Sequence, residues 1–216
     1  MDFLTIHNLL PREPNLLLSL IDTSISGNRD PVPYHVKKLS NHQRLILSDS
    51  GKIINIVKGY LLQQVNNNKQ NKQLINAIWV EGDFIFHNMF HQDCYDYLAL
   101  GDVELEIYDG EFLMKEIAVH SFFSDLLIDA LKQQEFHFYR YFHMLTKSAR
   151  ERIIDTIKLL STKKCTEGYH IPSKVNYLLL SKCCQISPHT AKKVMQELEQ
   201  ELKIIIKKDQ AILLYD

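Results

Sequence analysis

The chain has 216 residues and a formal net charge of −1 at pH 7; 45% of its residues are hydrophobic and 24% are charged. This balance excludes a disordered chain, because enough apolar surface is available to bury a core, and the length allows one large or two small domains. No apolar run is long enough to span a bilayer, and the N-terminus lacks the features of a signal peptide, so we expect a cytoplasmic protein without a membrane partner.

Along the chain, the N-terminal region predicts a short helix at Leu16–Ile21 and a loop at Ser24–Pro33. From Tyr34 to about Ile117 the pattern is β-rich. Strand-like runs are Leu45–Leu47, Lys52–Val57, Tyr60–Val65 and Gln73–Val80, and the polar stretch Asn66–Lys72 predicts a hairpin tip. Glycines fall where turns are expected, at Gly51, Gly59, Gly82, Gly101 and Gly110. Short strands at this spacing predict a barrel or sandwich.

From Ser121 to Leu160 the periodicity is helical. Leu131, Phe138 and Leu145 recur every seven residues, and Leu127, Gln134 and Tyr141 form a second row. Such a repeat suits a helix that pairs with its twin, although an amphipathic helix packed on its own domain has the same pattern. Ser148 is expected to cap a following helix. The buried face of that helix would hold Ile153, Ile154, Ile157 and Leu160.

The last thirty residues predict a capped helix followed by a hairpin. Ser187 suits the N-cap and Pro188 the first helical position. One face carries Ala191, Val194, Met195, Leu198 and Leu202, and the other carries His189, Thr190, Lys192, Lys193 and Gln196. A helix that presents short polar and basic side chains from its first turns suits a DNA major groove.

Charge follows the same division of the chain. From Lys147 onward there are 13 Lys and Arg against 8 Asp and Glu, a net +5, whereas the preceding residues have a net −6. The basic end coincides with the predicted DNA helix, although chance clustering on a solvated surface gives the same asymmetry.

The order of these pieces resembles the bacterial cyclic-AMP receptor and fumarate-nitrate regulator (Crp/Fnr) family. The local matches are Ile56–Gly59 with Glu81–Ile85, Ser148–Ile153, and Ile186–Met195. The resemblance implies an α+β fold with an N-terminal cyclic-nucleotide-binding-like β-roll (1–120). A long dimerisation helix (121–146) and a C-terminal winged helix-turn-helix DNA-binding domain (147–216) would follow.

The effector site departs from the family pattern. Phe86 and His87 stand where nucleotide-binding members have a Gly-Glu pair, and Tyr95-Asp96 stands where they have Arg-Ser. A carboxylate in place of the arginine repels a phosphate, so we expect no response to cyclic AMP and leave the small-molecule effector unknown. No cysteine precedes Cys94, so the iron–sulfur mechanism of the oxygen-sensing branch is not expected either. No cofactor is predicted.

The resemblance also implies DNA-binding residues. Base contacts fall to Ser187, His189, Thr190 and Lys193, and phosphate contacts to Lys192 and to the wing-tip residues Lys207 and Lys208; a solvated turn is the alternative for the last two. Gln185 occupies a turn position usually given to Gly, where a left-handed backbone costs a non-Gly residue about 1 kcal/mol, so we expect a slightly different turn.

Other side-chain groups have two interpretations each. His87, His91 and Cys94 are spaced i, i+4, i+7 and would share a helical face, but no fourth ligand is evident and no metal is predicted. The aromatic residues of the long helix suit dimer and interdomain packing, or alternatively an effector pocket. Cys183 and Cys184 are expected to be buried as small apolar residues. No arrangement of side chains predicts catalysis, so the protein is not expected to be an enzyme.

The resulting hypothesis is a homodimeric transcription regulator that binds a palindromic operator in double-stranded DNA. RNA polymerase would be a further partner if the protein activates transcription. One alternative is a regulator of the same fold without an effector. The other is a ligand-binding β-roll module whose C-terminal domain is a protein-interaction surface.

Overall fold

The structure, a computed structural model, describes residues 33–47, 50–67, 72–89, 95–118, 123–161, 168–173, 175–207 and 210–214. The helix and loop predicted before residue 33 therefore lie outside the described residues. The N-terminal elements are β1 (Tyr34–Leu39), β2 (Arg44–Leu45), β3 (Lys52–Asn67), β4 (Lys72–Val80), β5 (Phe84–His87), β6 (Tyr95–Asp109) and α3 (Gly110–Ala118). They are followed by α4 (Phe123–Thr146), α5 (Ala149–Leu160), β7 (Gly168–Ile171), α6 (Tyr177–Cys184), α7 (Pro188–Gln200), β8 (Ile204–Lys207) and β9 (Gln210–Leu214).

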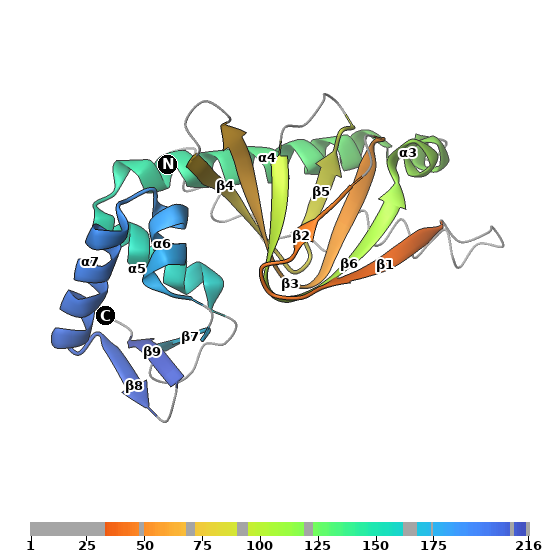
Figure 1. Cartoon of the computed structure of the whole chain (residues 1–216). Helices are drawn as coiled ribbons and strands as arrows, with labels where there is room; N and C mark the ends of the chain where they lie inside the picture. The colour runs from red at the N-terminus through yellow and green to blue at the C-terminus, as the bar shows by residue number, and fades with distance from the viewer. Residues whose placement is uncertain are drawn as a thin grey trace.

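The first six strands form an antiparallel sheet around two long central strands, β3 and β6 (Figure 1). Strands β1 and β2 pair with the two halves of β6, and β5 and β4 pair with the two halves of β3. Buried side chains from several strands, among them Ile54, Leu61, Trp79, Tyr97 and Leu105, fill the interior. This confirms the predicted strand-rich N-terminal region.

The predicted strands Lys52–Val57 and Tyr60–Val65 are parts of a single strand, β3. Strand β3 runs from Lys52 through Asn67, and its pairing with β6 shifts register at Val57 and at Gly59. Gly59 adopts φ +92°, and a Cβ at this position would lie 2.6 Å from the carbonyl oxygen of Asp102. Gly101 likewise lies inside β6 with φ +86°. These two glycines therefore permit irregularities within strands rather than turns between them, which corrects the sequence interpretation.

Helix α3 corrects the prediction that the β-rich region extends to Ile117. Asp109, the last residue of β6, accepts the backbone N–H of Phe112 at 3.0 Å. A carboxylate in this position supplies an acceptor for a free N–H of the first turn and favours the helix start. The same contact, together with Lys52, lowers the pKa of Asp109.

Helix α4 lies along the sheet and joins it to the C-terminal helices (Figure 1). It ends at Thr146, and Ser148 caps α5 as predicted. The Ser148 hydroxyl accepts the N–H of Glu151 while the Glu151 carboxylate accepts the N–H of Ser148, which together form a capping box. The Ser148 hydroxyl also lowers the pKa of Glu151.

Helices α5, α6 and α7 pack together beside a small antiparallel sheet of order β7-β9-β8. Their shared core includes Ile157, Leu180 and Leu198, and it is continuous with Leu62 and Ile75 of the large sheet. The C-terminal helices therefore rest directly on β3 and β4. None of the described helices is long and apolar enough to cross a membrane.

Candidate functional site

Helix α7 begins as the sequence predicts. The Ser187 hydroxyl accepts the N–H of Thr190 at 3.0 Å, and Pro188 occupies the first helical position. The Ser187 and Thr190 hydroxyls also lie 2.8 Å apart and share a hydrogen bond. Both hydroxyls thus stabilise the first turn, and this geometry fixes the direction in which the turn presents its other side chains.

The two faces of α7 separate by polarity. Ala191, Val194 and Leu198 are buried against α5 and α6, whereas His189, Lys192, Lys193 and Gln196 are exposed and Met195 and Thr190 are half-buried. Figure 1 shows α7 at the outer edge of the molecule, on the side away from the large sheet. The exposed face is consequently accessible to a partner.

Leu202 was predicted on the apolar face, and this was wrong. The helix ends at Gln200, and Leu202 follows it in a left-handed conformation with 69% of its surface exposed. The N–H of Lys203 bonds the carbonyl of Leu198 and closes the turn, which directs the Leu202 side chain outward.

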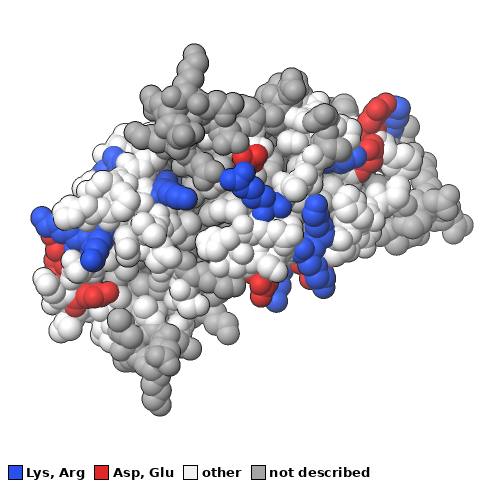
Figure 2. All heavy atoms as spheres, in the orientation of Figure 1, with Lys and Arg blue, Asp and Glu red and all other residues white. Residues whose placement is uncertain are grey.

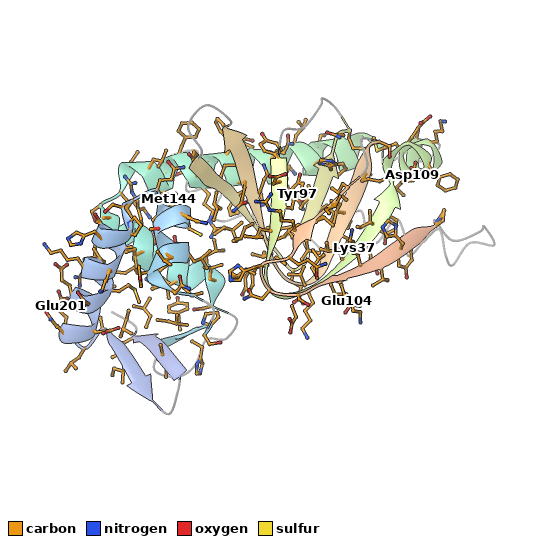
Figure 3. The ribbon with its side chains drawn as sticks, in the orientation of Figure 1. Lys37, Tyr97, Glu104, Asp109, Met144 and Glu201 are labelled. Atoms are coloured by element: carbon orange, nitrogen blue, oxygen red, sulfur yellow. The ribbon has the colours of Figure 1, made fainter. Side chains whose placement is uncertain are left out.

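Charge changes sign along α7. Its first turn carries no acidic residue, and the carboxylates Glu197, Glu199 and Glu201 lie toward its C-terminal end. Figure 2 shows Lys, Arg, Asp and Glu side chains mixed at this end of the molecule. Glu201, labelled in Figure 3, accepts two hydrogen bonds from Arg150 of α5, which lower its pKa. The N-terminal half of α7 is therefore the half that suits an anionic partner.

Of the two predicted wing-tip lysines, the structure describes only the backbone of Lys207. Lys207 is the last residue of β8, which pairs with β9 as the predicted hairpin requires. The side chain of Lys207 and the whole of Lys208 lie outside the described residues. Their predicted phosphate contacts therefore stay predictions.

The turn between α6 and α7 is left-handed at Gln185, although the cost to a non-Gly residue led us to expect a slightly different turn. Gln185 adopts φ 53° and ψ 47°, and the N–H groups of Gln185 and Ile186 both bond the carbonyl of Ser181. The Gln185 side chain also donates a hydrogen bond to the Tyr141 hydroxyl of α4. The Tyr141 hydroxyl therefore contacts its own chain, and the pairing of its row with a twin helix stays a prediction.

Arg152 is a positioning residue that the sequence did not identify. Its guanidinium donates to the carbonyls of Leu145 at 2.7 Å and Lys147 at 2.9 Å, where α4 ends. A third bond, 3.2 Å long, reaches the carbonyl of Cys184 at the end of α6. One side chain thereby satisfies helix-end carbonyls of both α4 and α6 and holds the two helices together.

A first cavity of about 640 Å³ lies between the large sheet and α4. Its walls are aromatic, with Trp79, Phe86, Tyr95 and Tyr97 from the sheet and Phe138 from α4. Figure 3 places Tyr97 on the sheet beneath α4. The volume falls within the range of small-molecule pockets.

A buried polar contact adjoins this cavity. His137 of α4 packs on Trp79, with ring centroids 4.0 Å apart, and its Nε2 lies 3.6 Å from Asp83 Oδ2. Asp83 also accepts the N–H of Val80 at 2.8 Å. This contact ties the position of α4 to the turn between β4 and β5.

The metal-ligand hypothesis assumed a helix, and His87 lies in strand β5 instead. His87 is buried, and its ring meets that of Tyr97 edge-on at 5.7 Å. His91 and Cys94 lie outside the described residues. Within the described ranges, no group of three or more His, Cys, Asp and Glu is placed to hold a metal ion.

Cys183 and Cys184 are buried and free, as expected. Burial raises the pKa of the Cys184 thiol to about 11 and raises that of Cys183 further. Both thiols are therefore protonated at neutral pH and contribute as apolar side chains.

Helix α4 also carries an exposed apolar row, the α4 stripe, formed by Ile128, Leu131, Phe138 and Phe142. Leu131 and Phe138 expose 64% and 65% of their surface. Leu131 and Phe138 belong to the first predicted row, whose last member, Leu145, is half-buried. Ile128 lies three residues before Leu131, and Phe142 lies four residues after Phe138. An exposed row of large apolar side chains at this spacing is the geometry of a helix-pairing surface.

Comparison with known proteins places the fold. No protein-family model matches the chain, and no curated protein matches it. A cyclic nucleotide-binding domain containing protein from Listeria monocytogenes EGD-e is 18% identical, with a TM-score of 0.70 over 91% of this chain and 97% of its own. The c-di-GMP responsive global regulator CLP from Xanthomonas campestris is 14% identical, with a TM-score of 0.64 over 85% and 95% of the two chains. A transcriptional regulator of the CRP family from Thermus thermophilus is 13% identical, with a TM-score of 0.66 over 83% and 92%.

These likenesses define the class by fold: an α+β chain with the β-roll of cyclic-nucleotide-binding proteins. The predicted resemblance to Crp/Fnr proteins is confirmed at this level. The last two of these structures are those of a global regulator and a transcriptional regulator.

Proposed function

We propose that this protein is a sequence-specific DNA-binding transcription regulator, in which α6 and α7 form a helix-turn-helix and β8–β9 its wing. The observation that carries the proposal is the N-terminal half of α7. It is exposed at the edge of the molecule, it presents His189, Lys192 and Lys193, and its first turn has no carboxylate. In helix-turn-helix proteins, the N-terminal residues of the second helix contact base edges in the major groove.

We assign the roles within α7 by position and exposure. His189 and Lys193 are exposed and can reach base edges, whereas Lys192 is expected to contact phosphate. Ser187 and Thr190 bond each other, so their base contacts would use the remaining lone pairs of the two hydroxyls. Lys193 also lies 3.8 Å from Glu197, an exposed pair that is weak enough for a DNA contact to replace.

The α4 stripe supports a homodimer. A second copy would bury the four side chains of the stripe and place two α7 helices on one face, as a palindromic operator requires. Phe138→Glu should convert a dimer to a monomer in sedimentation velocity. A dimer that persists unchanged would contradict this arrangement.

The effector differs from cyclic AMP in this proposal. Phe86 and Tyr95 line the cavity beside α4, and Asp96, next to Tyr95, lies 3.8 Å from Arg44. Neither the aromatic walls nor this carboxylate would neutralise a cyclic phosphate. Calorimetry should detect no cyclic-AMP binding, and binding at micromolar concentration would overturn this part of the proposal.

The decisive experiment selects bound fragments from genomic DNA and measures their affinity against salt. His189→Ala should change the sequence preference. Lys192→Ala should lower the slope of log K against log salt by about 0.9, because one phosphate contact is lost. Lys115→Ala is the matched control, since Lys115 is an exposed lysine in α3 paired only locally with Glu111.

Two outcomes would contradict the proposal. Failure to bind any fragment, with or without cell extract, would favour the alternative that the C-terminal domain contacts proteins. An equal change of slope in Lys115→Ala would mean that α7 is not the DNA-contacting element.

A further inference from the structure

A second cavity, of about 450 Å³, lies where the β-roll, α4 and the C-terminal helices meet. Its walls include Ile75 of β4, Met144 of α4, Leu159 of α5 and Cys183 of α6. Figure 3 shows Met144 at the end of α4, beside the C-terminal helices. Elements of both parts of the chain therefore contribute to one chamber, and its volume is in the range of small-molecule sites.

The charged residues that line this cavity are mostly cationic. Arg140, Lys147 and Lys158 contribute positive charges, and Asp155 is the one carboxylate among the lining residues that the structure describes. Asp155 already bonds Lys147, with Nζ and Oδ2 2.5 Å apart. Lys158 lies over the Tyr169 ring, 5.8 Å from its centroid. The lining thus has an excess of two positive charges, in a partly buried setting where charge interactions are stronger than in water.

Apolar side chains form another part of the lining, beside neutral polar residues such as Asn76 and Thr156. Ile75, Met144 and Leu159 form hydrophobic walls, and the buried Cys183 thiol is neutral. A neutral thiol is a poor nucleophile, so the chamber suits reversible binding rather than covalent capture. Cationic groups beside apolar walls fit a compact ligand that combines an anionic group with a hydrophobic part.

We propose that this interdomain cavity is a binding site for a small organic anion, with its carboxylate or phosphate at Arg140 and Lys158 and its apolar part against Met144 and Leu159. A ligand in the cavity contacts both parts of the chain and stabilises their present arrangement over others. Its effect on DNA affinity rests on the proposed function, whereas the binding itself does not.

The test uses phenyl phosphate as the probe and isothermal titration without DNA. We expect one site per chain, and Arg140→Gln and Lys158→Gln should each weaken binding about tenfold, because each removes one charge-assisted contact. Lys38→Gln, on the exposed β1 strand, is the charge-matched control and should leave affinity unchanged. Benzyl alcohol, which lacks the anion, should bind at least about tenfold more weakly.

A pair of filling variants separates the two cavities. Leu159→Trp should abolish binding by occupying this cavity, whereas Phe86→Trp, in the wall of the aromatic cavity, should not. Circular dichroism checks that both variants fold. If Leu159→Trp does not fold, the binding affinities of Arg140→Gln and Lys158→Gln test the proposal. Absence of binding, insensitivity to Arg140 and Lys158, or loss on Phe86→Trp alone would each overturn the proposal. DNA binding by the probe-free protein is measured separately, so failure here leaves the proposed function intact.

Discussion

The hydrogen bond between Tyr141 and Gln185 makes a quantitative prediction about how α4 holds the α6–α7 turn. Gln185 is left-handed, which costs a residue with a Cβ about 1 kcal/mol relative to glycine. The bond from its side chain to the Tyr141 hydroxyl contributes about 1 kcal/mol. Gln185→Gly relieves the backbone cost and removes the hydrogen bond. The two effects cancel, so we expect almost no change in the free energy of unfolding.

The Tyr141→Phe background separates the two effects. Tyr141→Phe alone should destabilise the protein by about 1 kcal/mol, because the hydrogen bond is lost while the backbone cost remains. Adding Gln185→Gly to that variant should restore about 1 kcal/mol, because only the strain is left to relieve. The double-mutant cycle therefore predicts a coupling energy of about 1 kcal/mol between the two residues.

Urea unfolding followed by far-ultraviolet circular dichroism measures these differences. Trp79, the only tryptophan, lies in the β-roll and provides an independent fluorescence signal for that part of the chain. If Gln185→Gly has the same effect with Tyr141 and with Phe at that position, the hydrogen bond contributes nothing and the reasoning is refuted. If Gln185→Gly destabilises the Tyr141→Phe variant, the left-handed backbone of Gln185 carries no strain.

Two further predictions concern a cap and a pair of glycines. Ser148→Ala should cost about 1 kcal/mol in urea unfolding, because an N-cap is lost. The lowered pKa of Glu151 means that its contribution is present above its unfolded pKa and is lost as the pH falls through its folded pKa, so the variant should show a flatter stability profile in that acidic range. Gly59→Ala should cost about 3 kcal/mol and Gly82→Ala about 1 kcal/mol in thermal or urea unfolding. Both glycines have positive φ, but nothing lies within 4 Å of a Cβ at Gly82, whereas at Gly59 the Asp102 carbonyl is in the way; equal losses would contradict this.

Features with a local cause could be predicted from the sequence. Ser148 and Ser187 precede helices as N-caps because their hydroxyls bond an N–H three residues later, and the apolar spacing of α7 follows from helical geometry. These parts of the chain carry their structural signals within a few residues. The left-handed Gln185 was not expected, because the cost of positive φ for a residue with a Cβ argued for a different turn.

Features that depend on distant partners could not be predicted. The role of Arg152 in joining α4 and α6 has no sequence signal, because its three acceptors are backbone carbonyls and any residue supplies a carbonyl. Helix α3 was missed because its capping carboxylate, Asp109, ends a strand, and nine residues give little periodicity. Leu202 followed the apolar spacing beyond the point where the Lys203–Leu198 bond ends the helix.

The two irregularities in β3 constrain how the length of this chain can vary. Because side chains alternate between faces, one residue inserted or deleted between Ile56 and Leu61 would turn every later side chain of β3 to the opposite face. Leu62, which packs in the C-terminal core, would then face the opposite side of the sheet. The loss of packing would therefore extend beyond the β-roll. Homologous sequences should therefore align without gaps across this short interval, even where their residues differ.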